Sequence, residues 1–114
     1  IVVDDDEAWH RSMRRALREL GVRRVYCMNA GDDAEQILGE FDRCVVLTEL
    51  KLGAHRLGGL SVVQAAERIG APAAVVTEAP PPEWHKLAAV PLLSKADVNP
   101  FTLRALLRDL EREL

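Results

Sequence analysis

The chain has 114 residues, of which 48% are hydrophobic and 29% charged, a balance typical of one globular domain and too short for two. Its net charge is −3 with both signs interspersed, so charge gives no argument for nucleic-acid binding. No apolar run is long enough to span a membrane and no signal peptide is visible, so we expect a cytoplasmic protein. Cys27 and Cys44 have no metal-ligand spacing and fall in predicted strands, where we interpret them as reduced core thiols.

Short apolar runs alternate five times along the chain with stretches of helical periodicity. The runs predict strands over residues 1–3, 22–28, 43–49, 73–76 and 90–94. The periodic stretches predict helices over residues 7–20, about 32–38, about 60–69 and 100–114. Prolines at 80–82 leave room for only a turn or two of helix over 83–89. The alternation predicts an α/β domain with a five-stranded parallel sheet, joined by right-handed crossovers and covered by helices on both faces.

Individual residues predict the ends and faces of these helices. Asp32 or Asp33 can cap the second helix, while Asn99 caps the last, which starts at Pro100. The third and last helices are each expected to bury an apolar stripe: Leu60, Val63, Ala66 and Ile69 in one, and Leu103, Leu106, Leu107, Leu110 and Leu114 in the other. The histidines share no ligand spacing and are interpreted as surface or loop residues: His10, His55 and His85. The two tryptophans, Trp9 and Trp84, are interpreted as packing residues.

Polar residues stand at the carboxyl ends of four of the five predicted strands. In a parallel sheet these ends meet in one crevice, where such sheets bind ligands. These residues are Asp4, Asp5, Glu49, Thr77 and Lys95. Carboxylates at close range raise one another's pKa unless a cation lies among them, and such oxygen ligands suit Mg²⁺. Thr77 offers a hydroxyl donor and Lys95 a cation for an anionic oxygen. Together these groups predict a site that takes up or holds a phosphoryl group.

The same residues, in this order, resemble the motifs of a response-regulator receiver domain of the chemotaxis-regulator type. The matching stretches are Val2-Val3-Asp4-Asp5, Leu47-Thr48-Glu49-Leu50-Lys51-Leu52, Gly58-Gly59-Leu60, Val75-Val76-Thr77 and Leu93-Ser94-Lys95. The resemblance implies one receiver domain over residues 1–114, with the flavodoxin-like strand order 2-1-3-4-5. It also implies a sensor histidine kinase or another signalling protein as partner, a monomer or weak dimer, and an output domain outside this chain.

The resemblance further implies a role for each site residue, none of them catalytic. Glu49 stands at the phosphoacceptor position. The implied Mg²⁺ ligands are Asp4, Asp5, Glu49 and the backbone carbonyl of Lys51. The implied phosphoryl-stabilising and switch residues are Thr77 and Lys95, with Leu92 at the position of the switch aromatic.

The chain departs from the family pattern most sharply at Glu49, which replaces the acceptor aspartate. The other departures are Gly53 for the usual proline, Leu92 for the usual aromatic, and Ala96 for the common proline after the lysine. The loop that leads to Gly59 is longer than the family pattern. The stretch from Thr77 to Lys95 is shorter, which predicts a reduced fourth helix.

The extra carbon of Glu49 moves its carboxylate outward by about 1.5 Å relative to aspartate. A displacement of about 1 Å in a reacting group can cost about a hundredfold in rate. The carboxylate carries a charge of about −1, whereas a phosphoryl group carries about −1.5 to −2. We therefore interpret the chain as a non-enzymatic pseudo-receiver that keeps the fold and the metal pocket, with phosphorylation lost or vestigial. It is expected to act through protein–protein interaction, with Mg²⁺ bound weakly or not at all.

Two other interpretations stay open at this point. In the first, the chain is a working phosphorelay receiver, in which Glu49 itself accepts the phosphoryl group or replaces a native aspartate as a phosphomimic. In the second, the chain is a small Mg²⁺-dependent phosphohydrolase on a related fold. No histidine is placed as a general acid or base, and no glycine-rich phosphate loop follows a strand, so the sequence favours a receiver.

Overall fold

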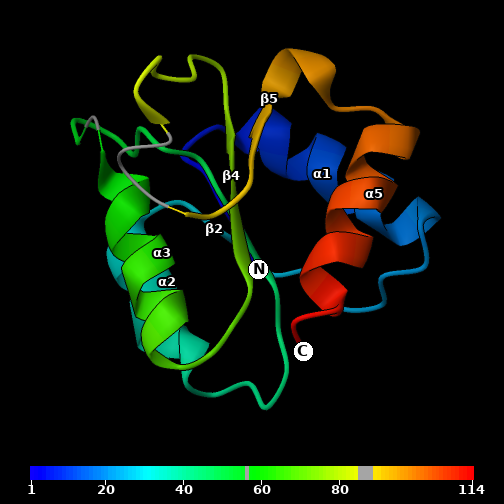
Figure 1. Cartoon of the computed structure of the whole chain (residues 1–114), viewed down its shortest axis with the longest axis horizontal. Helices are drawn as coiled ribbons and strands as arrows, with labels where there is room; N and C mark the ends of the chain where they lie inside the picture. Colours follow the sequence, from blue (N-terminus) through cyan, green and yellow to red (C-terminus); the bar gives the residue numbers. More distant parts are fainter. Residues whose placement is uncertain (56, 85–88) are drawn as a thin grey trace.

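The computed structural model describes residues 1–55, 57–84 and 89–114. Five strands form one parallel sheet in the order β2-β1-β3-β4-β5, which confirms the expected topology (Figure 1). The strands are β1 (Val2–Val3), β2 (Cys27–Met28), β3 (Val46–Thr48), β4 (Ala73–Thr77) and β5 (Leu92–Ser94). The helices are α1 (Glu7–Glu19), α2 (Gly31–Leu38), α3 (Gly58–Arg68) and α5 (Pro100–Glu111), with a short 3₁₀ helix η1 (Lys95–Asp97).

The helices cover both faces of the sheet, α2 and α3 on one side and α1 and α5 on the other (Figure 1). Strand β4 contributes side chains to the core on both faces of the sheet. Ala73 and Val75 pack toward α2 and α3, while Ala74 and Val76 pack toward α1 and α5. All four side chains are buried, as expected for a strand inside a doubly covered parallel sheet. Of the helices in the described parts of the chain, none is long and apolar enough to cross a bilayer.

The two helices on the α1 side begin at well-formed caps. The Asp6 side chain accepts hydrogen bonds from the backbone N–H groups of Ala8 and Trp9, which starts α1 directly after the β1 tip. The predicted start of the last helix is confirmed, because Asn99 and Thr102 form a capping box and Pro100 opens α5. The β1–α1 turn is therefore held in one short, hydrogen-bonded path beside the strand ends.

Several predicted boundaries are wrong. The run at 22–28 pairs only at Cys27–Met28, and the run at 43–49 only at Val46–Thr48, because apolar residues outside the hydrogen-bonded ladder still pack in the core. Cys44 therefore lies before β3 rather than in it; both cysteines are free and half-buried. Helix α2 begins at Gly31 after Ala30 without a side-chain cap, so the predicted caps lie inside its first turn instead: Asp32 and Asp33.

The apolar face of α3 also differs from the prediction. The buried residues are Gly59, Val62, Val63, Ala65 and Ala66. Leu60 is only half-buried and Ile69, which follows the helix, is 48% exposed. The buried face is turned toward Val62 instead, because α3 packs against α2 as well as the sheet. In α5 the predicted stripe is buried as far as Leu110, but Leu114 lies beyond the helix end and is exposed. Most of the expected short helix over 83–89, and His85 with it, falls on residues 85–88, which lie outside the described residues.

Candidate functional site

The site forms where β1, β3 and β4 end and η1 begins. Val3 pairs with Thr48, so the next residue of each strand, Asp4 and Glu49, lie beside one another at the same edge of the sheet. Thr77 pairs with Ser94, so Lys95 follows at that edge as well. An open cavity of about 960 Å³ is lined by residues 78–83 and by the side chains at the strand ends: Asp4, Glu49, Thr77 and Lys95. The crevice expected from the strand ends is therefore present.

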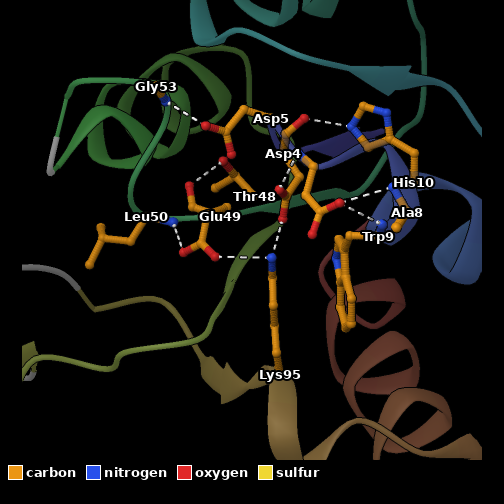
Figure 2. Close-up of polar contacts among 11 residues, drawn as sticks. Asp4, Asp5, Ala8, Trp9, His10, Thr48, Glu49, Leu50, Gly53 and Lys95 are labelled. Carbon is orange, nitrogen blue, oxygen red and sulfur yellow. Dashed lines mark hydrogen bonds and ion pairs between the residues drawn. The ribbon is translucent and has the colours of Figure 1, made fainter.

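Lys95 forms ion pairs with two carboxylates at once (Figure 2). Its Nζ lies 2.6 Å from Asp4 Oδ2 and 3.2 Å from Glu49 Oε2. None of the three side chains is more than 8% exposed. Because water is largely excluded, these charges interact more strongly than a surface pair and depend on each other for neutralisation.

The Glu49 carboxylate is bound at both oxygens. Oε1 accepts a hydrogen bond from the backbone N–H of Leu50 at 2.7 Å, while Oε2 faces Lys95. Thr48, which is fully buried, donates its hydroxyl to the Glu49 carbonyl at 2.9 Å. The N–H of Gly59 donates to the Leu50 carbonyl at 2.8 Å and brings the start of α3 against this segment. Backbone and side chain together therefore fix the direction of Glu49.

Asp4 is the most deeply buried charge in the site. Its Oδ1 accepts from the backbone N–H of Asp6 at 2.9 Å, and Oδ2, though close to Lys95, forms no well-aligned hydrogen bond with the described residues. Burial raises the pKa of Asp4 above its ordinary value; Lys95 and the Asp6 N–H only partly offset this, and the charge of Glu49 adds to it.

Lys95 is held in its charged form. Burial alone would lower its pKa, but the close contact and charge of Asp4, followed by those of Glu49, outweigh burial and raise the pKa above its ordinary value. Its Nζ also lies over the Trp9 ring, 4.7 Å from the ring centroid. An indole face attracts a cation, so Trp9 adds to the pull of the two carboxylates.

Asp5 lies in the same cavity but takes no part in the ion pairs. It is exposed, and its Oδ2 accepts from the backbone N–H of Gly53 at 3.0 Å. Gly53 has φ of +60°, a left-handed conformation that proline cannot adopt, and proline would also lack the N–H. The glycine at this family proline position thus permits the contact that turns Asp5 toward the loop after β3.

The arrangement does not fit a bound Mg²⁺. Mg²⁺ requires near-octahedral oxygen coordination, usually with one or two carboxylates and several waters. Within the described residues, no three histidine, cysteine, aspartate or glutamate side chains come close enough to hold a metal ion. The oxygens of Asp4 and Glu49 that face the cavity centre are already occupied by Lys95.

Of the remaining predicted residues, Thr77 and Lys51 line the cavity and Leu92 does not. Thr77 is buried at the end of β4 and lines the cavity. Lys51 also lines it, with an exposed side chain. Leu92 is half-buried and packs against the core on the α2–α3 side. The geometry thus brings Asp4, Glu49 and Lys95 into contact, while Lys51 and Leu92 lie outside the ion pairs.

The sequence did not reveal the part that two residues, His10 and Trp9, play in the site. His10 was expected at the surface but is 6% exposed, and its Nε2 lies 2.5 Å from the Asp4 carbonyl oxygen. Its spacing from Met13 and Leu17, three and seven residues on, places it on the buried face of α1 and could have revealed this. Trp9 does pack in the core, as expected, but its contact with Lys95 has no sequence signal.

No protein-family profile matches the chain, and no curated protein matches it in sequence. Solved structures of receiver domains do match its fold. The signal receiver domain of a modulated diguanylate cyclase from Desulfovibrio desulfuricans G20 has a TM-score of 0.84 and 20% identity, over 98% of this chain and 92% of that one. A response regulator receiver protein from Sinorhizobium medicae WSM419 has a TM-score of 0.82 and 18% identity, over 96% and 90%.

A CheY-like receiver domain protein from Methanospirillum hungatei JF-1 has a TM-score of 0.79 and 22% identity, over 98% of this chain and 92% of that one. These likenesses extend over nearly the whole chain. The chain therefore has the receiver-domain fold, as the motifs in its sequence indicated.

Proposed function

We propose that the chain is a pseudo-receiver: a single signalling domain, residues 1–114, whose site holds a fixed negative charge instead of a phosphoryl group. The receiver fold supports the signalling role, and the environment of Glu49 carries the rest. Both oxygens of its carboxylate are bound, one by Leu50 N–H and the other by Lys95. Each oxygen still has a second lone pair, but the carboxylate is fixed in direction and lies about 1.5 Å beyond the position of an aspartate carboxylate, which misplaces it for attack on a phosphoryl donor.

In this proposal Glu49 stands in for the charge of the phosphorylated state. Its extra carbon extends the carboxylate into the cavity, where Lys95 pairs with it at 3.2 Å. Thr77 lines the same cavity, and in this proposal its hydroxyl serves as the switch group. The domain then acts through binding rather than catalysis, with a sensor kinase or another cytoplasmic signalling protein as the proposed partner.

The proposal is tested by incubating the purified chain with Mg²⁺ and acetyl phosphate and measuring its intact mass. We expect no added phosphoryl group on the wild-type chain. The matched variant is Glu49→Asp, which keeps the charge and removes the extra carbon. Phosphorylation of this variant but not the wild type would show that the extra carbon blocks acceptance.

A stoichiometric phosphoryl group on Glu49 of the wild-type chain would overturn the proposal and favour a working phosphorelay receiver. Glu49→Gln serves as the control for site assignment, because it keeps the side-chain length and removes the nucleophile. A phosphoryl group that persists in Glu49→Gln would have to reside on another residue and would leave the assignment of Glu49 intact.

A further inference from the structure

The ammonium of Lys95 occupies the position between the two buried carboxylates where a bound cation would be expected (Figure 2). Asp4 and Glu49 contribute one oxygen each, and the Trp9 ring lies over the same ammonium at 4.7 Å. Two carboxylate oxygens and an aromatic face form a favourable surrounding for an ammonium. A hydrated Mg²⁺ gains nothing comparable from an indole in place of an oxygen ligand.

Each of the four oxygens of the two buried carboxylates already has one partner. Asp4 Oδ1 is bound by the N–H of Asp6 and Glu49 Oε1 by that of Leu50, which leaves one oxygen on each residue facing the cation. Lys95 is bound to both of these oxygens. Backbone N–H groups cannot be removed from the other two without unfolding the β1–α1 turn and the end of β3.

Displacement of Lys95 by a metal ion would also carry a cost at the lysine. Its side chain is 8% exposed, so an ammonium pushed off Asp4 and Glu49 without leaving the pocket would be a buried, unpaired charge. Breaking a buried ion pair in this way is strongly unfavourable. The Lys95 side chain therefore competes directly with any divalent cation for the two oxygens.

We propose that Lys95 is the resident cation of this pocket and that it makes the site independent of divalent metal. This inference rests on the proposed function and deepens it, because a pocket whose two buried carboxylates are bridged by its own ammonium needs neither a metal ion nor a phosphoryl group to hold its structure. Metal binding and phosphoryl acceptance are then lost for different reasons. Lys95 prevents metal binding, and the length of the Glu49 side chain prevents phosphoryl acceptance.

The test is a Mg²⁺ titration of the whole chain followed by backbone amide NMR. The amides of Asp6 and Leu50 are the reporters, since both donate to the site carboxylates. In the wild type we expect no saturable shift of these amides. In Lys95→Met we expect saturable binding at least tenfold tighter than the wild-type limit, which corresponds to about 1.4 kcal/mol.

Lys51→Met is the matched control. It removes the same charge by the same substitution from the same cavity, but its exposed side chain takes no part in the ion pairs and its backbone carbonyl is kept. Like the wild type, it is expected to show no saturable shift of the Asp6 and Leu50 amides, so that an effect of Lys95→Met cannot come from net charge alone. If Lys95→Met does not fold, Lys95→Gln, which keeps a polar donor but no charge, takes its place.

Saturable Mg²⁺ binding at Asp6 and Leu50 in the wild-type chain would overturn the inference without any variant. So would an equal gain in Lys51→Met and Lys95→Met, since net charge would then explain it. The proposed function has its own readout, the intact mass after exposure to acetyl phosphate. A chain that binds Mg²⁺ but gains no phosphoryl group would refute the resident cation and leave the pseudo-receiver standing.

Discussion

Replacement of Gly59 by alanine is expected to destabilise the domain, although alanine is normally the better helix former. Gly59 lies in the first turn of α3, where its N–H donates to the Leu50 carbonyl. A Cβ at this position would lie 2.9 Å from Leu50 Cα and 3.0 Å from the Glu49 carbonyl carbon, and these are backbone atoms that cannot rotate away. Helix α3 would have to move off the segment that carries the site carboxylate.

Overpacking of this kind costs about 1–3 kcal/mol, and a clash with backbone belongs at the upper end of that range. Replacing a helical glycine by alanine returns about 1 kcal/mol. The net loss for Gly59→Ala is therefore about 2 kcal/mol in the free energy of unfolding. For a domain of this size that corresponds to a fall in Tm of about 8 °C.

Urea unfolding followed by circular dichroism measures this loss, with Gly39→Ala as the matched control. Gly39 has φ of −71° and nothing within 4 Å of an added Cβ, so alanine there should stabilise by about 0.4–1 kcal/mol. The two substitutions are chemically identical and have opposite expected signs. A Gly59→Ala variant as stable as the wild type, with Gly39→Ala stabilised, would refute the close approach of α3 to Glu49.

Two further outcomes are expected. Asn99→Ala removes the side chain that caps Phe101 N–H at 2.9 Å and Thr102 N–H at 3.0 Å, and should lower the free energy of unfolding by about 1 kcal/mol in the same urea assay; an unchanged midpoint would contradict the cap. Because burial raises the pKa of Asp4 in the folded state, the stability from that group is greatest below its ordinary pKa and is lost as the pH rises through the raised value. Asp4→Asn, which does not titrate, should therefore gain relative to the wild type from acid toward neutral pH, and a relative loss over that range would mean that Lys95 outweighs burial.

The arrangement of the chain follows from its sequence more closely than the limits of its strands do. Alternating apolar runs and periodic stretches indicated five parallel strands, and the sheet contains them. The predicted strand at 22–28 was too long because Val22 and Val25 pack in the core without joining the ladder. Apolar pattern reports burial, whereas strand limits depend on hydrogen-bond pairing with a neighbour, which a single sequence does not contain.

The sequence predicts those site residues whose positions depend only on where the strands end. Asp4 and Glu49 follow paired residues of adjacent strands, so their proximity is a consequence of topology. The direction of Asp5 depends instead on the positive φ of Gly53, and the burial of His10 on how α1 sits over the sheet. Such features arise from tertiary geometry, and only the helical spacing of His10 was readable beforehand.

The two-sided binding of the Glu49 carboxylate has a consequence for how such a domain is controlled. A phosphorylated receiver is reset when the phosphoryl group is hydrolysed, so its output follows the balance of kinase and phosphatase. Under the proposed function, a charge that belongs to the side chain cannot be hydrolysed away. The strength of the signal would then follow the number of copies of the protein, and its synthesis and degradation would take the place of the chemical reset.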